Sequence, residues 1–322
     1  MKVVELRDLM NARAAAGRPF FFAVDFLAHK ALFQEGAEGI IEFSFPNGQS
    51  GRTSLVPSIL PSITPHPIPL ELYARGFKRV QKALHYGDSF LLNYTVRTPV
   101  DLSCSLEELY PQIPAPYRLH VPGRFLCFSP EPFVRISREG RISSFPMKGT
   151  ISLATPNAAS ALLHDPKELA EHYTIVDLIR NDLSRVATTV RVERFRYLEE
   201  INTRRGKILQ TSSEIAGHLQ PDWPSHIGDT ILALLPAGSI TGAPKEATVR
   251  TILEAETAPR GFYTGVAGYF DGSYLESTVL IRYIEQQGDA FYFHSGGGIT
   301  TQSTCEGEYQ EMLDKIYLPT HL

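Results

Sequence analysis

Short apolar runs, separated by glycine and proline, dominate the pattern along the chain. The first 60 residues contain PFFFAVDF and GIIEFSF, which are typical of strands joined by turns. Further strands are predicted at FLLNYTVRTPVDL, RFLCFSP, FVRIS, RISSFPMKG and ILQTSSEIAGHL. Residues 261–298 predict a three-stranded meander, because Asp271-Gly272 and Gln287-Gly288-Asp289 are turn sequences. The pattern as a whole therefore favours β-structure.

Helical spacing of apolar residues occurs in fewer, separate places. It predicts helices over 69–86 and 166–183, and shorter ones at GDTILALLP, PKEATVRTILEAE and CEGEYQEMLDKIYL. The Pro-rich stretch 57–69 predicts an irregular connection. Strands outnumber helices and the helices are dispersed, which indicates an α+β fold with antiparallel sheets.

Composition narrows the class of protein further. The 322 residues are 43% apolar, enough for a substantial core, and the net charge of -4 predicts no general surface for nucleic acid or membrane. The N-terminus lacks the apolar core of a signal peptide, and the run FFFAV is too short to span a bilayer. The three cysteines lack metal-ligand spacing and cannot form a disulfide framework. We therefore expect a cytoplasmic protein.

Two predicted helices each carry a pair of glutamates. Glu168 and Glu171 are three residues apart, as are Glu308 and Glu311, so each pair shares a helix face. Hard divalent cations bind carboxylate oxygens, and magnesium usually takes one or two of them plus substrate oxygens. Two such helices could hold a magnesium ion, whereas each pair taken alone is more typical of a solvated helix face.

Other segments hold candidate binding and catalytic groups. The glycines of SGGGIT (295–300) and PAGSITGAPK (236–245) could present backbone N–H groups to carboxylates, or form flexible turns. Lys148 in PMKGT could be a desolvated nucleophile or a surface lysine, and Glu131 in SPEPF could be a general acid or base, or an exposed edge charge. The charged end of VDLIRNDLSRV (176–186) predicts an ion-pair network that caps its helix.

Taken together and in this order, these stretches resemble the chorismate-utilising enzymes, which include anthranilate synthase component I, aminodeoxychorismate synthase component I, and the isochorismate and salicylate synthases. The matching stretches are GDSFLLNYTV, FSPEPF, PMKGT, ELAEHYTIVDLIRNDLSRV, PAGSITGAPK, TGVAGYF, IRY, HSGGGI and EGEYQEMLDK. The resemblance implies one chorismate-binding catalytic domain over 1–322, with a shortened N-terminal part (1–68) and a motif-bearing core (69–318). It also implies two large, curved antiparallel sheets packed face to face, with helices outside and the site between them.

The resemblance also assigns roles to residues. It implies that Mg2+ bridges the ring carboxylate of chorismate to Glu171 and Glu311, with Glu168 and Glu308 as their neighbours. The other carboxylate is expected at the backbone amides of the glycine run, near an arginine, a tyrosine and a lysine. These predicted contacts are Gly296, Gly297, Gly298, Arg282, Tyr269 and Lys315. Four further substrate contacts are implied at Gly149, Thr150, Gln210 and Thr241.

Lys148 decides the branch within this family. Aminodeoxychorismate synthases typically carry P-I-K-G-T, with the lysine as a nucleophile and a residue matching Glu131 as its catalytic partner, whereas anthranilate synthases carry alanine at the lysine position. Isochorismate and salicylate synthases place a water-activating lysine at a position that falls near Leu91, and leucine cannot activate water. Gln210 stands where the family has histidine, and glutamine can donate a hydrogen bond but cannot shuttle protons.

The predicted function is aminodeoxychorismate synthase component I, which makes 4-amino-4-deoxychorismate for p-aminobenzoate and folate synthesis. Ammonia is expected from a separate glutamine amidotransferase subunit, because the sequence has no G-x-C-x-G-type nucleophile segment. No Leu-Glu-Ser-type motif for tryptophan binding is found, so tryptophan control is not expected. The alternatives are anthranilate synthase component I, which residue 148 disfavours, and a non-catalytic chorismate-binding protein, which only Gln210 favours.

Overall fold

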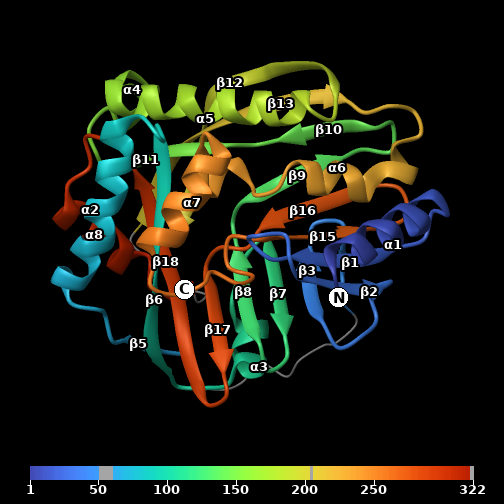
Figure 1. The fold of residues 1–322 in the computed structure, drawn as a ribbon, viewed down its shortest axis with the longest axis horizontal. Helices are drawn as coiled ribbons and strands as arrows, with labels where there is room; N and C mark the ends of the chain where they lie inside the picture. The colour runs from blue at the N-terminus through green and yellow to red at the C-terminus, as the bar shows by residue number, and fades with distance from the viewer. Residues whose placement is uncertain (51–60, 204–205, 320–322) are drawn as a thin grey trace.

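The computed structural model describes residues 1–50, 61–203 and 206–319. Within these residues the strands form two nine-stranded antiparallel sheets (Figure 1). The first sheet contains β11 (Met147–Ser152), β13 (Gly206–His218), β10 (Arg141–Ser144), β9 (Pro132–Ile136), β16 (Leu275–Val279), β15 (Val266–Phe270), β1 (Phe20–Val24) and β2 (Ala31–Glu35) in that order, with β12 (Thr188–Thr203) beside β13. The second contains β14 (Gly242–Ala243), β6 (Leu91–Leu102), β18 (Ala290–Ile299), β17 (Tyr283–Gln287), β8 (Phe125–Ser129), β7 (Tyr117–Val121), β3 (Glu42–Phe45) and β4 (Gly48–Gln49), with β5 (Ile63–Pro65) beside β6.

An aromatic layer joins the two sheets. Phe43 of β3 stacks on Phe21 of β1, with ring centroids 5.1 Å apart, and lies 4.9 Å from the ring of Tyr269 on β15. Strand side chains alternate between the two faces of a sheet, so Phe20 and Phe22 point the other way, into the helix-covered core. The sheets therefore pack face to face, and the predicted α+β architecture is confirmed.

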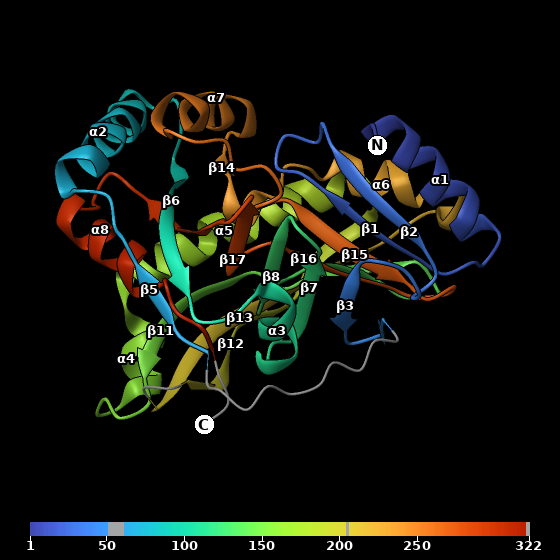
Figure 2. The same ribbon diagram turned by 90° about the horizontal axis from the view of Figure 1, so that it is seen from below.

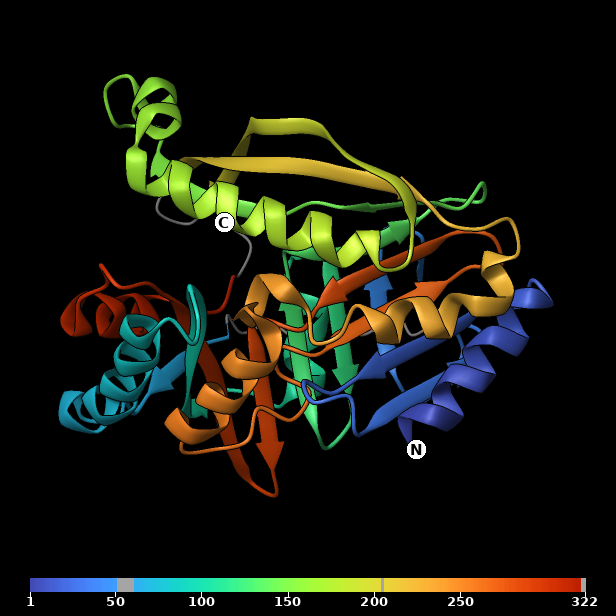
Figure 3. The same ribbon diagram turned by 45° about the horizontal axis from the view of Figure 1, so that its top comes forward.

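Helices cover the outer faces (Figures 2 and 3). The α-helices are α1 (Val3–Ala15), α2 (Leu70–Tyr86), α3 (Leu106–Leu109), α4 (Ala158–His164), α5 (Pro166–Ser184), α6 (Ile227–Ala233), α7 (Lys245–Ala255) and α8 (Cys305–Asp314), and the short 3-10 helices are η1 (Tyr110–Gln112), η2 (Trp223–His226) and η3 (Gly238–Ile240). α1 packs on α6, α2 packs on α7, and α5 packs on β11, β12 and β13. None of the helices in the described ranges is long and apolar enough to cross a membrane.

The structure differs from the sequence pattern in several places. Residues 3–15, expected among strands and turns, form α1, whose buried Leu6, Met10 and Ala14 repeat every four residues. RISSFPMKG divides into β10 and β11 around Pro146, which has no N–H to donate to a sheet. Of the Pro-rich connection, residues 57–60 lie outside the described residues, and β5 interrupts the remainder.

The predicted three-stranded meander is the largest correction. Residues 261–298 contain four strands, and they belong to two sheets: β15 and β16 lie in the first, β17 and β18 in the second. The chain crosses between the sheets at Leu280–Arg282, where the N–H of Val279 donates to the carbonyl of Glu131 (3.2 Å) and Arg282 has a φ of 54°. This crossing carries Arg282 to the space between the sheets.

Candidate functional site

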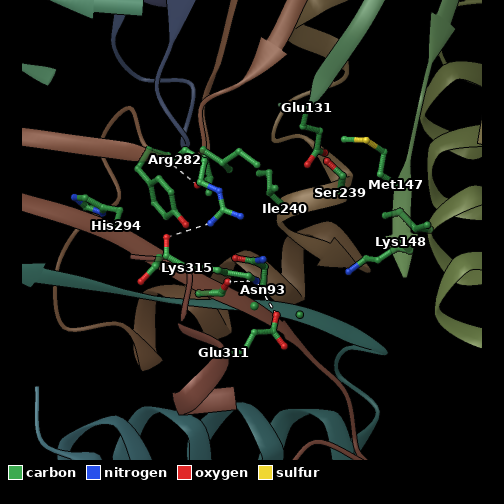
Figure 4. Close-up of a pocket in the computed structure, with 18 residues that line it drawn as sticks. Asn93, Glu131, Met147, Lys148, Ser239, Ile240, Arg282, His294, Glu311 and Lys315 are labelled. Atoms are coloured by element: carbon green, nitrogen blue, oxygen red, sulfur yellow. Dashed lines mark hydrogen bonds and ion pairs between the residues drawn. The ribbon is translucent and has the colours of Figure 1, made fainter. Parts of the chain in front are cut away.

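A cavity of about 170 Å3 lies between the two sheets, where β6, β11 and β18 approach η3. Figure 4 shows charged side chains entering it from opposite sides, with Lys148 on one side and Arg282, Lys315 and Glu311 on the other. The lining residues are Asn93, Glu131, Met147, Lys148, Ile175, Ser239, Ile240, Tyr263, Thr264, Ile281, Arg282, His294, Ser295, Gly296, Gly297, Gly298, Glu311 and Lys315. The cavity is thus a polar site with apolar walls.

Lys148 enters the cavity from an irregular part of β11. Met147 pairs with Ser212 and Thr150 with Gln210, so the two residues between them both face a single residue of β13, Thr211. The hydroxyl of Thr211 donates to the Lys148 carbonyl, which fixes this bulge. Gly149 has a φ of 84°, a conformation that favours glycine. The bulge therefore directs the amine of Lys148 into the cavity (Figure 4).

Leu91 and Lys148 meet at one point, beside Gly298. A Cβ atom placed on Gly298 would be 3.2 Å from Cδ1 of Leu91 and 3.3 Å from Nζ of Lys148. Leu91 comes from β6 of the second sheet, whereas Lys148 comes from β11 of the first. An amine on either strand could therefore reach the same part of a bound molecule.

Glu131 is held by its main chain at the turn before β9. Its N–H donates to Oγ of Ser129 (3.1 Å), and its carbonyl accepts from Oγ1 of Thr278 (2.7 Å). Burial raises the pKa of the Glu131 carboxyl, while a hydrogen bond from Ser239 and the charges of Lys148 and Lys315 oppose that shift. A raised pKa favours the protonated carboxyl, which is the form that a general acid donates from.

The opposite end of the cavity is cationic. Nζ of Lys315 donates to the carbonyl of Gly296 (2.7 Å) and to Oε1 of Glu311 (2.7 Å), and Nη1 of Arg282 donates to the carbonyl of Lys315 (3.2 Å). Burial lowers the pKa of Lys315, and the neighbouring Glu311 opposes that change. This arrangement suits a carboxylate, since one guanidinium and one ammonium offer several charge-assisted donors.

Of the four predicted glutamates, Glu311 lines the cavity, whereas Glu168, Glu171 and Glu308 are not among its lining residues. A Cβ on Gly297 would be 2.9 Å from Oε1 of Glu311 and 3.2 Å from Oε2 of Glu308, and one on Gly149 would be 2.8 Å from Oε2 of Glu168. Glu171 lines a neighbouring pocket of about 550 Å3, which Leu91 also borders. Among the described residues no group of three or more metal-ligating side chains is present. Two carboxylates with substrate oxygens fit Mg2+, which needs only one or two protein ligands.

Five predicted substrate contacts do not line the cavity, and the first of them is Gly149, the glycine of the bulge. Tyr269 packs in the aromatic layer instead, because its strand position faces Phe43. Thr150 is exposed beyond the bulge, and Thr241 is buried with Oγ1 donating to the carbonyl of Ala237 (2.8 Å). Gln210 lies on β13 outside the lining, and its buried Nε2 has no hydrogen-bond partner.

Several lining residues were not predicted. Tyr263, rather than Tyr269, reaches the cavity, and burial raises its pKa, so it stays a phenol that can donate a hydrogen bond. Nε2 of His294 lies 2.9 Å from Oε2 of Glu285, and burial lowers the pKa of this histidine. Asn93 and Ser239 fall inside stretches that the sequence analysis matched, whereas Tyr263 lies just before one. Proximity to a motif was the available signal for these residues.

The sequence is similar to a known protein family and to several known proteins. The model of the family described as chorismate binding enzyme matches residues 54–320. An uncharacterized PabA-like protein of Haemophilus influenzae is 49% identical over 304 residues, which cover 94% of this chain and 92% of that protein. The aminodeoxychorismate synthase component 1 of Bacillus subtilis is 33% identical over 261 residues, which cover 76% of this chain but 54% of that enzyme. The present chain thus matches about half the length of that relative.

The fold has solved counterparts. The menaquinone-specific isochorismate synthase of Escherichia coli superimposes with a TM-score of 0.71, covering 98% of this chain and 81% of that one, at 16% sequence identity. At that identity the similarity concerns the fold. It includes the N-terminal strands that precede the segment matched by the family model.

Proposed function

Because the chain belongs to the family of chorismate binding enzymes, we propose that it is component I of an aminodeoxychorismate synthase. In this reaction chorismate and ammonia give 4-amino-4-deoxychorismate and water. The observation that carries the proposal is the amine of Lys148, which enters the cavity beside Gly298. Leu91, which also lies beside Gly298, stands where the isochorismate branch would have its lysine. The anthranilate branch carries alanine at position 148, and the isochorismate branch requires a base near Leu91.

Lys148 is the proposed nucleophile. Its amine adds to ring carbon 2, the two ring double bonds shift, and the 4-hydroxyl leaves as water with a proton from Glu131. Ammonia then adds to carbon 4, the double bonds shift back, and Lys148 is released from carbon 2. The raised pKa of Glu131 supports its role as the proton donor, since a carboxyl that holds its proton can protonate a leaving hydroxyl.

Substrate binding follows the two carboxylates of chorismate. Arg282 and Lys315 are the proposed partners of one carboxylate, together with main-chain groups of the glycine run at 296–298. Glu171 and Glu311, with Glu168 and Glu308 beside them, would hold Mg2+ against the ring carboxylate. A bound magnesium ion supplies positive charge that neutralises this carboxylate.

Ammonia is proposed to come from a separate glutamine amidotransferase subunit, and free ammonium at high concentration should replace it. The direct test incubates the purified protein with chorismate, MgCl2 and ammonium chloride, and identifies the product by mass spectrometry. We expect aminodeoxychorismate, which is lost when magnesium is chelated. Anthranilate or isochorismate as the product would refute the assignment, and unchanged chorismate would favour a non-catalytic binding protein.

Lys148→Ala tests the covalent role. We expect the aminating rate to fall by about 100-fold or more, because the variant has no amine to displace the 4-hydroxyl. Lys82→Ala is a control, since Lys82 lies on α2, away from the cavity-lining residues. Steady-state rates with chorismate and ammonium provide the measurement. An intact rate in Lys148→Ala would exclude lysine as the nucleophile.

A further inference from the structure

The turn η3 places one hydroxyl against the catalytic carboxyl. Ser239 is the middle residue of this turn, and its side chain hydrogen-bonds the carboxyl of Glu131. Figure 4 shows the two side chains side by side at the wall of the cavity. Glu131 lies in the turn that precedes β9, so the contact joins two segments that are far apart in the sequence.

A buried ion pair lies directly behind this turn. Nζ of Lys245, the first residue of α7, is 2.8 Å from Oδ2 of Asp182, near the end of α5, and the two side chains are 15% and 7% exposed. The same ammonium donates to the carbonyl of Leu234 (2.9 Å). A Cβ on Gly238 would be 3.0 Å from Oδ2 of Asp182. The turn η3 therefore packs against the carboxylate of Asp182, which is paired with Lys245.

This pair was not the one expected from the sequence. VDLIRNDLSRV predicted a capping network, but Arg180 pairs with Asp177 on the exposed side of α5, at 2.6 Å. Asp182 faces inward instead. Burial raises the pKa of Asp182 and lowers that of Lys245, because it disfavours both charged forms. The charge of each partner opposes the shift of the other. A buried pair of this kind often adds little net stability, whereas it fixes geometry.

We propose that Ser239 is a positioning residue for Glu131, and that the Asp182–Lys245 pair fixes the turn that carries Ser239. The Ser239 hydroxyl sets the orientation of the Glu131 carboxyl, and the ion pair sets the position of that hydroxyl. The inference rests on the proposed function only in treating Glu131 as the catalytic acid. The charged groups that face Glu131 are Lys148 from β11 and Lys315 from the residue after α8.

Ser239→Ala is the first test, with Ser239→Thr as the conservative variant. Loss of the hydrogen bond should reduce kcat for chorismate consumption by about tenfold and leave KM within about twofold, because the substrate contacts remain. The Glu131 hydrogen bond lowers the carboxyl pKa, so its removal should move the corresponding limb of the kcat–pH profile to higher pH. Ser239→Thr should restore both values.

Asp182→Asn tests the ion pair, and Asp182→Asn/Lys245→Met removes both charges while keeping the side-chain volumes, in case the single variant folds poorly. Both variants should move the Glu131 limb of the kcat–pH profile to higher pH. Adding Ser239→Ala to either variant should move that limb no further. Asp177→Asn, the same change at the exposed pair of the same helix, should leave the profile unchanged. An additive shift, or no shift with the ion pair removed, would overturn the proposal.

Titration of the Glu131 carboxyl by carbon NMR separates this inference from the proposed function. The signal is assigned from its absence in Glu131→Gln. A higher midpoint in Ser239→Ala and in the ion-pair variants would support the positioning role even if the product is not aminodeoxychorismate. An unchanged midpoint in a protein that does form aminodeoxychorismate would refute the positioning role and leave the proposed function standing.

Discussion

Two tyrosines near the cavity have different surroundings. Tyr263 lines the cavity beside the ring of His294, with centroids 4.9 Å apart, whereas Tyr269 packs against Phe43. We expect Tyr263→Phe to raise KM for chorismate about tenfold, because the hydroxyl that can donate to the substrate is lost. Tyr269→Phe is the matched control and should leave KM unchanged. Steady-state kinetics distinguish the two, and the opposite result would place Tyr269 at the substrate.

The meeting of Leu91 and Lys148 beside Gly298 permits a test of branch identity. Leu91→Lys combined with Lys148→Ala moves the amine from β11 to β6, to a residue whose side chain also lies beside Gly298. We expect amination to be lost and a slow water-derived product to appear, because the amine on β6 occupies the position of a water-activating base. Mass spectrometry in 18O-labelled water detects the incorporated oxygen. Lys148→Ala alone should show no incorporation.

Site residues were predictable from the sequence where they lie in motifs that carry several chemical groups in a fixed order. Lys148, Glu131 and Arg282 lie in such motifs, and the structure brings all three to one cavity. Tyr263 could not be distinguished from Tyr269, because both are single aromatic residues in one apolar segment, and the pattern does not show that Tyr269 lies on β15 whereas Tyr263 precedes it. His294 lies inside the matched stretch HSGGGI, but no role was predicted for it, since its partner Glu285 lies on another strand.

At the scale of elements, the contact between β18 and α8 sets the position of two carboxylates. Gly297 leaves room for Glu311 and Glu308, since a Cβ would be 2.9 and 3.2 Å from their oxygens. Gly297→Ala should therefore displace these carboxylates and raise the magnesium concentration for half-maximal rate about tenfold. A methyl group at Gly298 would instead lie against Leu91 and Lys148. Gly298→Ala should therefore lower kcat and leave the magnesium dependence unchanged. Magnesium titrations of the rate compare the two variants.

Helices with strong periodicity were predictable to within a few residues, as α2 and α5 show. α2 ends at Gly87, whose φ of 81° is the usual conformation for a glycine that caps a helix. The division of residues 261–298 between two sheets was not predictable. A hairpin has the same alternating pattern in either sheet, and the crossing at Leu280–Arg282 depends on tertiary contacts such as the one from Val279 to Glu131.

Across the whole molecule, the aromatic layer between the sheets should dominate stability. Phe43 is fully buried between Phe21 and Tyr269. Phe43→Ala should lower the free energy of unfolding by about 3–5 kcal/mol, because it leaves a cavity that the two sheets cannot close. Phe90→Ala, at a side chain that is 68% exposed, should cost less than about 1 kcal/mol. Urea denaturation measures both, and equal losses would mean that the layer is not the main junction of the sheets.

The pairing of β1 with β15 has a consequence for biosynthesis. Phe20 lies opposite Phe270, so a segment made among the first residues completes its sheet only after most of the polypeptide has been translated. At about 5–20 residues per second, the phenylalanines of β1 wait on the order of 10–50 s on the ribosome for the second of their two partner strands, β15. A nascent chain of this protein can therefore pair the FFF sequence at 20–22 with β2 but not with β15 for that interval, which leaves one edge of β1 open to aggregation.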